Sequence, residues 1–285
     1  MSKRNGAKHL VDARAANPEG QIETPDSSNY TGAHGAGNQH IPENDHPKPL
    51  IFPLSQYPEW RRDPRALTFL KTFYPRQLAA KQWIGDAAEA IDYDKAKWWL
   101  PFIAIANNLD ELGAVLARAE GLPRVMAIRG AVRLASMSKE RINRIYRMDR
   151  AEEPDIEDAP RHALMIDLDS KPEPPHFDWR DDPALAALWA AETYLPSAWK
   201  GARFFYQYSS GAAFKPGLRL HFWYWLTEPK TCTDLKADFN RRYGKDRFDL
   251  ALFTPNQAHY TAAPVFVNRP DPLEGRRCGF AGGVR

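Results

Sequence analysis

The sequence predicts an α+β fold in which a mixed sheet is flanked by helices and preceded by an N-terminal arm. From Ile51 onward, short runs with the two-residue period of strands alternate with runs that have the 3.6-residue period of helices. Residues 1–49 contain one aromatic side chain, Tyr30, although the chain has 9 Trp, 11 Tyr and 14 Phe. We therefore expect a flexible, disordered arm at 1–49 and a single domain at 50–285.

In the N-terminal half of that domain, about 50–160, the best-defined element is a helix that Asn108 caps. Leu112 and Leu116 lie on its apolar stripe, and Gly121 ends it. The other elements expected in this half are a helix at 65–73, a buried strand at 98–106, a strand at 124–132 and a helix at 139–148.

The second half, about 161–285, has clearer strand alternation. We expect strands at 163–169, 203–208, 218–226 and 260–267, and helices at 183–195 and 233–243.

Composition excludes several classes of protein. The 285 residues are 43% hydrophobic and 26% charged, which suits one large domain, and the net charge of +3 does not by itself indicate a nucleic-acid partner. Two cysteines, Cys232 and Cys278, are too few for a disulfide framework or a cysteine-built zinc site. The longest apolar run, 98–106, is too short for a membrane span, and no apolar signal core is present. We expect a cytoplasmic protein without membrane partners.

The strand at 163–169 ends in two carboxylates. Because side chains alternate along a strand, Asp167 and Asp169 share a face, about 7 Å apart at the backbone. Like charges at that spacing either lie at an exposed strand end or hold a divalent metal ion.

A group of anion-binding side chains gathers around the strand at 218–226. Arg219 and His221 share one face of it. The strand follows a turn with Ser209 and Ser210 and a loop with Lys215, and this set of donors suits a triphosphate. The alternative is that His221 is an ordinary core residue, although burying Arg219 beside it without partners would be costly.

A third acidic residue, Asp249, enters an apolar segment soon after Gly244 ends the preceding helix. Taken alone, it suits a capping or turn role equally well.

In this order the three stretches resemble the motifs of the archaeo-eukaryotic primase superfamily, in its branch from bacterial plasmids, phages and prophages. That family has a strand ending in Asp-x-Asp, a strand with a His, often preceded by a Ser-rich turn, and a later acid after an apolar residue. The segment 256–264 is also similar to a recurrent sequence of this branch. One departure is that Arg219 stands where the family has Ser two places before His221, so the serine role would pass to Ser209 or Ser210.

The resemblance implies a primase-type catalytic core with an RRM-like half, which makes primers on single-stranded DNA from NTPs or dNTPs for a mobile element, as a DNA primase or primase-polymerase. By the same resemblance, two Mg²⁺ or Mn²⁺ ions would be held by the three carboxylates Asp167, Asp169 and Asp249. The phosphates of the incoming nucleotide would be held by Ser209, Ser210, Lys215, Arg219 and His221.

A basic stretch precedes the motifs. Between Arg124 and Arg150, eight Lys or Arg residues stand against two acidic ones. The helix expected at 139–148 would carry Arg141, Arg144 and Arg147 on one edge. This edge either contacts the phosphates of the template or is a solvated helix face.

Other functions remain open at this point. Asp-x-Asp also occurs in nucleases and nucleotide-sugar transferases, and a primase-like DNA-binding initiator module without activity is a further alternative. No Gly-x-x-x-x-Gly-Lys-Ser/Thr loop is present. A helicase partner would therefore be on a separate chain or on another part of a longer polypeptide.

Overall fold

The computed structural model describes residues 51–144 and 154–283. It is an α+β structure with two main antiparallel sheets and three α-helices in the described ranges. The predicted arm at 1–49 lies outside these ranges.

The first sheet has five strands in the order β1-β4-β2-β5, with β7 also pairing with β4. Its strands are β1 (Ile51–Pro53), β4 (Trp98–Ile105), β2 (Ala66–Thr72), β5 (Val125–Ile128) and β7 (Ile142–Asn143). Both faces are buried: Phe69 and Ala127 pack into one apolar cluster, whereas Leu70 and Met126 pack into another.

Two predictions for this sheet are wrong, and burial on both faces explains the first of them. The segment 65–73 forms strand β2 rather than a helix, because a strand buried on both faces shows a continuous apolar run without the two-residue period. The helix predicted at 139–148 is also wrong where it is described, since Ile142 and Asn143 form β7. Residues 145–148 lie outside the described ranges.

The second sheet has four strands in the order β13-β10-β11-β9. They are β13 (Cys278–Ala281), β10 (Phe204–Tyr208), β11 (Leu218–Lys230) and β9 (Arg161–Lys171). The strands predicted at 163–169, 203–208 and 218–226 are confirmed, whereas β13 was not predicted. On one face, Tyr224 packs against Trp199, which contacts Phe239 of α3.

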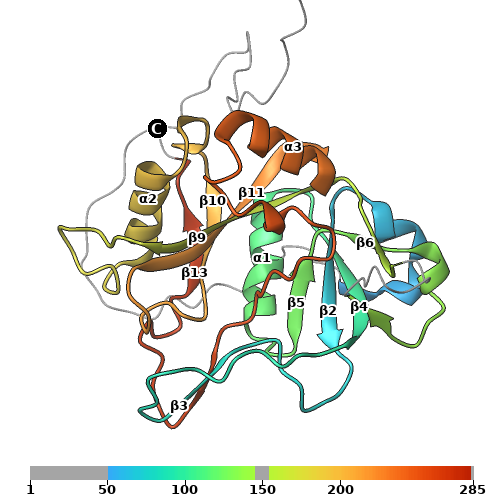
Figure 1. The fold of residues 1–285 in the computed structure, drawn as a ribbon, viewed down its shortest axis with the longest axis horizontal. Coiled ribbons are helices and arrows are strands. Elements are labelled where there is room, and N and C mark those ends of the chain that lie inside the picture. The colour runs from blue at the N-terminus through green and yellow to red at the C-terminus, as the bar shows by residue number, and fades with distance from the viewer. Residues whose placement is uncertain (1–50, 145–153, 284–285) are drawn as a thin grey trace, which may run out of the picture. The chain divides into compact units, whose positions relative to one another are not determined.

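Three helices accompany the sheets, and all three were predicted. They are α1 (Leu109–Glu120), α2 (Pro183–Tyr194) and α3 (Cys232–Tyr243). Figure 1 shows α1 between the strands of the two sheets, and its apolar residues join a cluster with side chains from both. The Asn108 side chain accepts a hydrogen bond from the N–H of Glu111, which confirms the predicted N-cap.

Two small strand pairs complete the described structure. β12 (Val265–Val267) runs parallel to β3 (Gln82–Ile84), and β6 (Ala131–Val132) pairs with β8 (Ile156–Glu157). The strand predicted at 124–132 is therefore divided into β5 and β6. Short 3-10 helices lie at Leu54–Gln56, Pro58–Arg62, Leu134–Ser136, Ser197–Trp199 and Leu250–Leu252.

A buried arginine ties the start of β9 to the chain that leads into β2. Arg161 is fully buried, and its guanidinium donates to the carbonyl oxygens of Arg61 and Asp63, both at 2.6 Å, and of Arg129 at 3.1 Å. Burial lowers the pKa of Arg161 to about 9. These bonds hold the two sheets in a fixed relation at the end where β9 begins.

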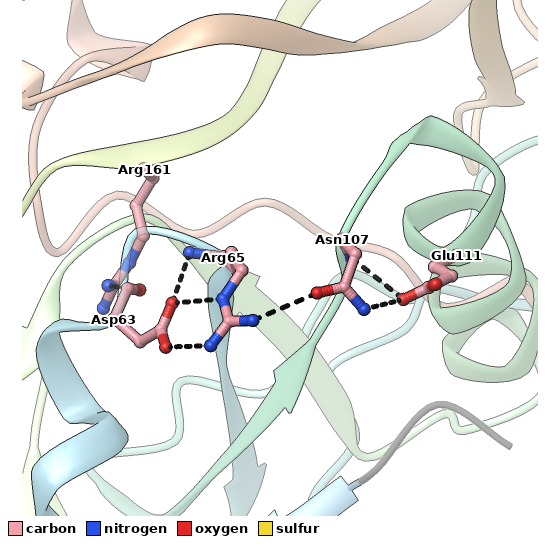
Figure 2. Close-up of polar contacts among 5 residues, drawn as sticks. All are labelled: Asp63, Arg65, Asn107, Glu111 and Arg161. Carbon is pink, nitrogen blue, oxygen red and sulfur yellow. Dashed lines mark hydrogen bonds and ion pairs between the residues drawn. The ribbon is translucent and has the colours of Figure 1, made fainter. Parts of the chain in front are cut away.

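A chain of polar contacts continues from this point to α1, as Figure 2 shows. The carboxylate of Asp63 accepts three bonds from Arg65, and Arg65 Nη1 donates to Asn107 Oδ1 at 3.1 Å. Asn107 in turn donates twice to Glu111 in the first turn of α1. Each of these exposed contacts alone adds little stability, but together they fix the position of the chain where α1 begins.

Candidate active site

A pocket of about 200 Å³ lies against the four-stranded sheet. Three stretches of sequence that are far apart in the chain contribute to its wall. Its polar lining includes five of the residues singled out in the sequence, which are Asp167, Ser209, Ser210, His221 and Asp249.

The pocket is built on one row of side chains that crosses the sheet. Gln207 of β10 is paired in register with His221 of β11, which is paired with Asp167 of β9. His221 Nε2 lies 3.4 Å from Asp167 Oδ1. Because paired residues point to the same face, the three polar groups gather without any loop to position them.

Asp167 is held in an environment that opposes its negative charge. Burial raises its pKa, and the charges of Asp169 and Asp249 raise it further, while those of His221 and Arg219 lower it. The raised pKa means that repulsion and desolvation outweigh the nearby positive charges. A cation bound beside this carboxylate would relieve both.

Asp169 lies at a β-bulge and is not among the described residues that line the pocket. Asp169 and Ser170 together oppose Arg219, where strict alternation would pair one residue with one. Ser170 has a φ of 54°, and Gly217 on the facing strand has a φ of 79°. The Asp169 side chain is 60% exposed and forms an ion pair with Arg219, which also donates to Ser170. Of the two carboxylates of the Asp-x-Asp pair, which we expected to share one site, Asp167 lines the pocket and Asp169 does not.

Asp249 combines the two roles considered for it. Its Oδ1 accepts a hydrogen bond from the N–H of Ala251 at 2.9 Å, so it caps the short helix Leu250–Leu252. It also lines the pocket, and its charge reaches Asp167. Capping fixes the position of the carboxylate at the pocket wall.

The Ser-rich turn closes another side of the pocket. Ser210 Oγ lies 2.8 Å from the hydroxyl of Tyr93, and its carbonyl accepts from the indole N–H of Trp83 at 3.0 Å. Lys215 follows this turn and is exposed; it does not line the pocket, and its stem covers Gly211 next to Arg219.

The segment 254–262 forms the remaining wall and is attached to both sheets. Gly130 N–H donates to the carbonyl of Pro255, and a Cβ at Gly130 would lie 2.6 Å from that oxygen, so glycine is required for this approach. His259 pairs through its backbone with Ala127 at the edge of β5. From the other sheet, Gln207 Nε2 donates to the carbonyl of Thr261 at 2.5 Å.

The residues of the pocket lining that were not assigned a role from the sequence include Tyr93, His259 and Tyr260. The rings of Tyr93 and Tyr260 stack with centroids 3.6 Å apart. The similarity of 256–264 to a recurrent sequence was the one signal that could have found His259 and Tyr260, whereas Tyr93 lies in a segment without any motif.

The predicted basic helix edge is corrected by the structure. Arg141 lies over the rings of Phe73 and Trp98, at 4.8 Å from each centroid. Arg144 is partly buried, and its Nη1 donates to the carbonyl of Asn256 at 2.8 Å. Arg147 lies outside the described residues. Arg141 and Arg144 therefore do not belong to one helical edge, because the segment that carries them is extended.

The described residues show neither a preformed cluster of metal ligands nor a membrane-spanning helix. Within 51–144 and 154–283, no three or more His, Cys, Asp or Glu side chains are grouped so that they could hold a metal ion. Over the same residues, no helix has the length and apolar character needed to cross a membrane.

Comparison with known proteins identifies no relative of this chain. The chain matches no protein-family model, no curated protein and no solved structure.

Proposed function

We propose that the protein is a DNA primase or primase-polymerase that carries out metal-dependent nucleotidyl transfer on single-stranded DNA. The observation that supports this most is the convergence on one pocket of Asp167, His221 and Asp249, which come from three separate motifs. The Ser209–Ser210 turn lies at the same pocket. The resemblance to the primase superfamily singles out these residues together with Asp169, Lys215 and Arg219, which do not line the pocket.

The residues of the chain have distinct roles in this proposal. His221 and the Ser209–Ser210 turn hydrogen-bond the phosphates of the incoming nucleotide, and Arg219 and Lys215 supply positive charge beside them. Asp167 and Asp249 are the carboxylates that would hold a divalent metal ion at the pocket wall. The stacked pair Tyr93 and Tyr260 limits the width of the pocket on the side of the nucleoside.

The carboxylates suit Mg²⁺ or Mn²⁺. Both are hard ions that prefer carboxylate oxygens, and the raised pKa of Asp167 indicates a negative charge without sufficient compensation. Such ions, when bound, lower the pKa of an attacking hydroxyl and neutralise the phosphates. Asp169 would join Asp167 and Asp249 as a ligand only if its ion pair with Arg219 opens.

One observation favours a second candidate, a primase-like initiator module that binds DNA without catalysis. Asp169 is engaged by Arg219 and is absent from the pocket lining, which leaves two carboxylates there. A module that had lost activity would still bind DNA but would make no product.

Unprimed synthesis tests the proposal. The protein is incubated with single-stranded DNA, labelled NTPs or dNTPs, and Mg²⁺ or Mn²⁺, and the products are separated by length. We expect oligonucleotides from the wild type and none from Asp249→Asn, which keeps a side chain able to cap the helix at Leu250. Absence of product from the wild type across templates and metals contradicts the catalytic proposal. DNA binding in that case supports the initiator module.

A further inference from the structure

The imidazole of His259 lies at the inner wall of the pocket, between the two sheets. Its backbone N–H donates to the carbonyl of Ala127 at 2.8 Å, and its carbonyl accepts from Ala127 N–H at 2.9 Å. Its ring meets Trp223 of β11 edge to face, with centroids 5.9 Å apart. These contacts fix the ring without using either of its nitrogens.

Both ring nitrogens of His259 lack a hydrogen-bond partner among the described residues, although the residue is only 1% exposed. Three neighbouring groups share this condition. They are His221 Nδ1, Gln207 Oε1 and Thr261 Oγ1. Buried polar groups are normally paired, so the concentration of unpaired groups at one pocket indicates a polar ligand that pairs with them.

His259 is uncharged at neutral pH. Burial lowers its pKa to about 3, and the charges of Arg129 and His221 act in the same direction. A neutral imidazole has one N–H donor and one acceptor nitrogen. It can therefore donate to a hydroxyl or accept from one, whereas towards a phosphate oxygen it can only donate.

The charges around the pocket indicate which part of a nucleotide faces His259. Asp167 and Asp249 line the pocket, and no Lys or Arg is among its described lining residues. Arg219 and Lys215, which suit phosphates, lie outside that lining. The proposed function gives the phosphates to His221 and the Ser209–Ser210 turn, and gives Asp167 and Asp249 to the metal. The neutral imidazole of His259, with one donor and one acceptor, is left for a group that can both donate and accept, such as a sugar hydroxyl.

We propose that His259 hydrogen-bonds a sugar hydroxyl of the bound nucleotide and thereby selects its sugar. This inference rests on the proposed function, because it takes the ligand of the pocket to be a nucleotide. It adds a specificity-determining residue that belongs to none of the three motifs.

The test compares the binding of ATP, dATP and 2′,3′-dideoxy-ATP, each with Mg²⁺, by calorimetry. We expect the wild type to bind at least one hydroxyl-bearing nucleotide about tenfold more tightly than the dideoxy form, the effect of one hydrogen bond. His259→Phe should lose that preference and bind the dideoxy form as the wild type does.

Two controls separate this effect from damage to the fold. The exposed His176 lies outside the pocket lining, and His176→Phe should keep the sugar preference. The melting temperature of His259→Phe should equal or exceed that of the wild type, because the change removes two unpaired polar atoms from the interior. His259→Leu serves the same purpose if phenylalanine does not fit.

The outcomes distinguish the two proposals. A wild type that binds none of the three nucleotides overturns the proposed function. If the wild type binds nucleotide without a sugar preference, the role of His259 is overturned. It is also overturned if the variant keeps the preference or loses affinity equally for all three sugars.

Discussion

Two buried threonines of the five-stranded sheet are fully paired, whereas two polar residues of the four-stranded sheet beside the pocket are not. In the five-stranded sheet, Thr68 Oγ1 donates to the carbonyl of Gly130 at 2.7 Å, and Thr72 Oγ1 donates to that of Gln77 at 2.8 Å. In the four-stranded sheet, Gln207 and His221 each keep an unpaired buried atom beside the pocket. The first arrangement serves stability, and the second leaves polar groups available to a ligand at some cost in stability. Substitutions in the two sheets should therefore separate stability from activity.

The largest effect is expected from Asp167→Asn in the four-stranded sheet. It keeps the shape of the side chain but removes a charged metal ligand, so we expect synthesis to fall by roughly 10³-fold. The melting temperature should not fall, because a carboxylate with a raised pKa gains little from its surroundings. Glu228→Gln on β11 is the matched control, since that side chain is 81% exposed. If Asp167→Asn unfolds, or if it keeps full activity, substitutions in this sheet do not separate stability from activity.

The largest loss of stability is expected from Phe69→Ala in the five-stranded sheet. Phe69 is 1% exposed and packs between the sheet and α1. Deleting its ring should lower the free energy of unfolding by about 3–5 kcal/mol. Denaturant unfolding measures this loss, and Lys71→Ala, at the exposed position of β2, should change it by less than about 0.5 kcal/mol. A loss of nucleotide affinity in the still-folded Phe69→Ala protein would show that the two sheets are not separable.

The pH dependence of stability should carry the signature of His259. Its pKa is lowered to about 3 in the folded protein, against an ordinary value of 6.5, so below pH 6.5 the unfolded chain binds the proton first. The contribution of His259 to the free energy of unfolding is therefore fully present above pH 6.5. It falls as the pH decreases towards 3, by up to about 1.4 kcal/mol per pH unit. His259→Phe should lack this contribution. The measurement is the difference in unfolding free energy between the two proteins at pH 6.5, 5.5 and 4.5, and a constant difference would refute it.

The smallest effect is expected at the helix between the sheets. Asn108→Ala removes the acceptor for the Glu111 N–H and should cost about 1 kcal/mol without changing nucleotide affinity. Arg118→Ala, on the exposed side of α1, is the control. If the two variants are equally stable in thermal unfolding, the cap contributes nothing.

In the four-stranded sheet the sequence predicted β9, β10 and β11. In the five-stranded sheet it predicted β4 and β5 but assigned a helix to the segment that forms β2. β9 and β11 place polar residues such as Asp167 and His221 at regular intervals, so their alternation is visible. β2 is apolar on both faces, and Leu67 and Leu70 happen to stand three residues apart as they would in a helix.

The candidate site was likewise predictable only where it depended on alternation. The convergence of Asp167 and His221 follows from strand geometry. The bulge at Ser170 depends on pairing with a distant strand, so the separation of Asp169 could not be seen in the sequence. His259 and Tyr93 reach the pocket through long-range contacts that carry no local pattern.

A crystal structure with Mn²⁺ and a non-hydrolysable nucleotide tests the central claim most directly. We expect anomalous density for Mn²⁺ against the carboxylates of Asp167 and Asp249, with the phosphates near His221 and the Ser209–Ser210 turn. Nucleotide and metal bound elsewhere on the protein, with this pocket free of both, would contradict it.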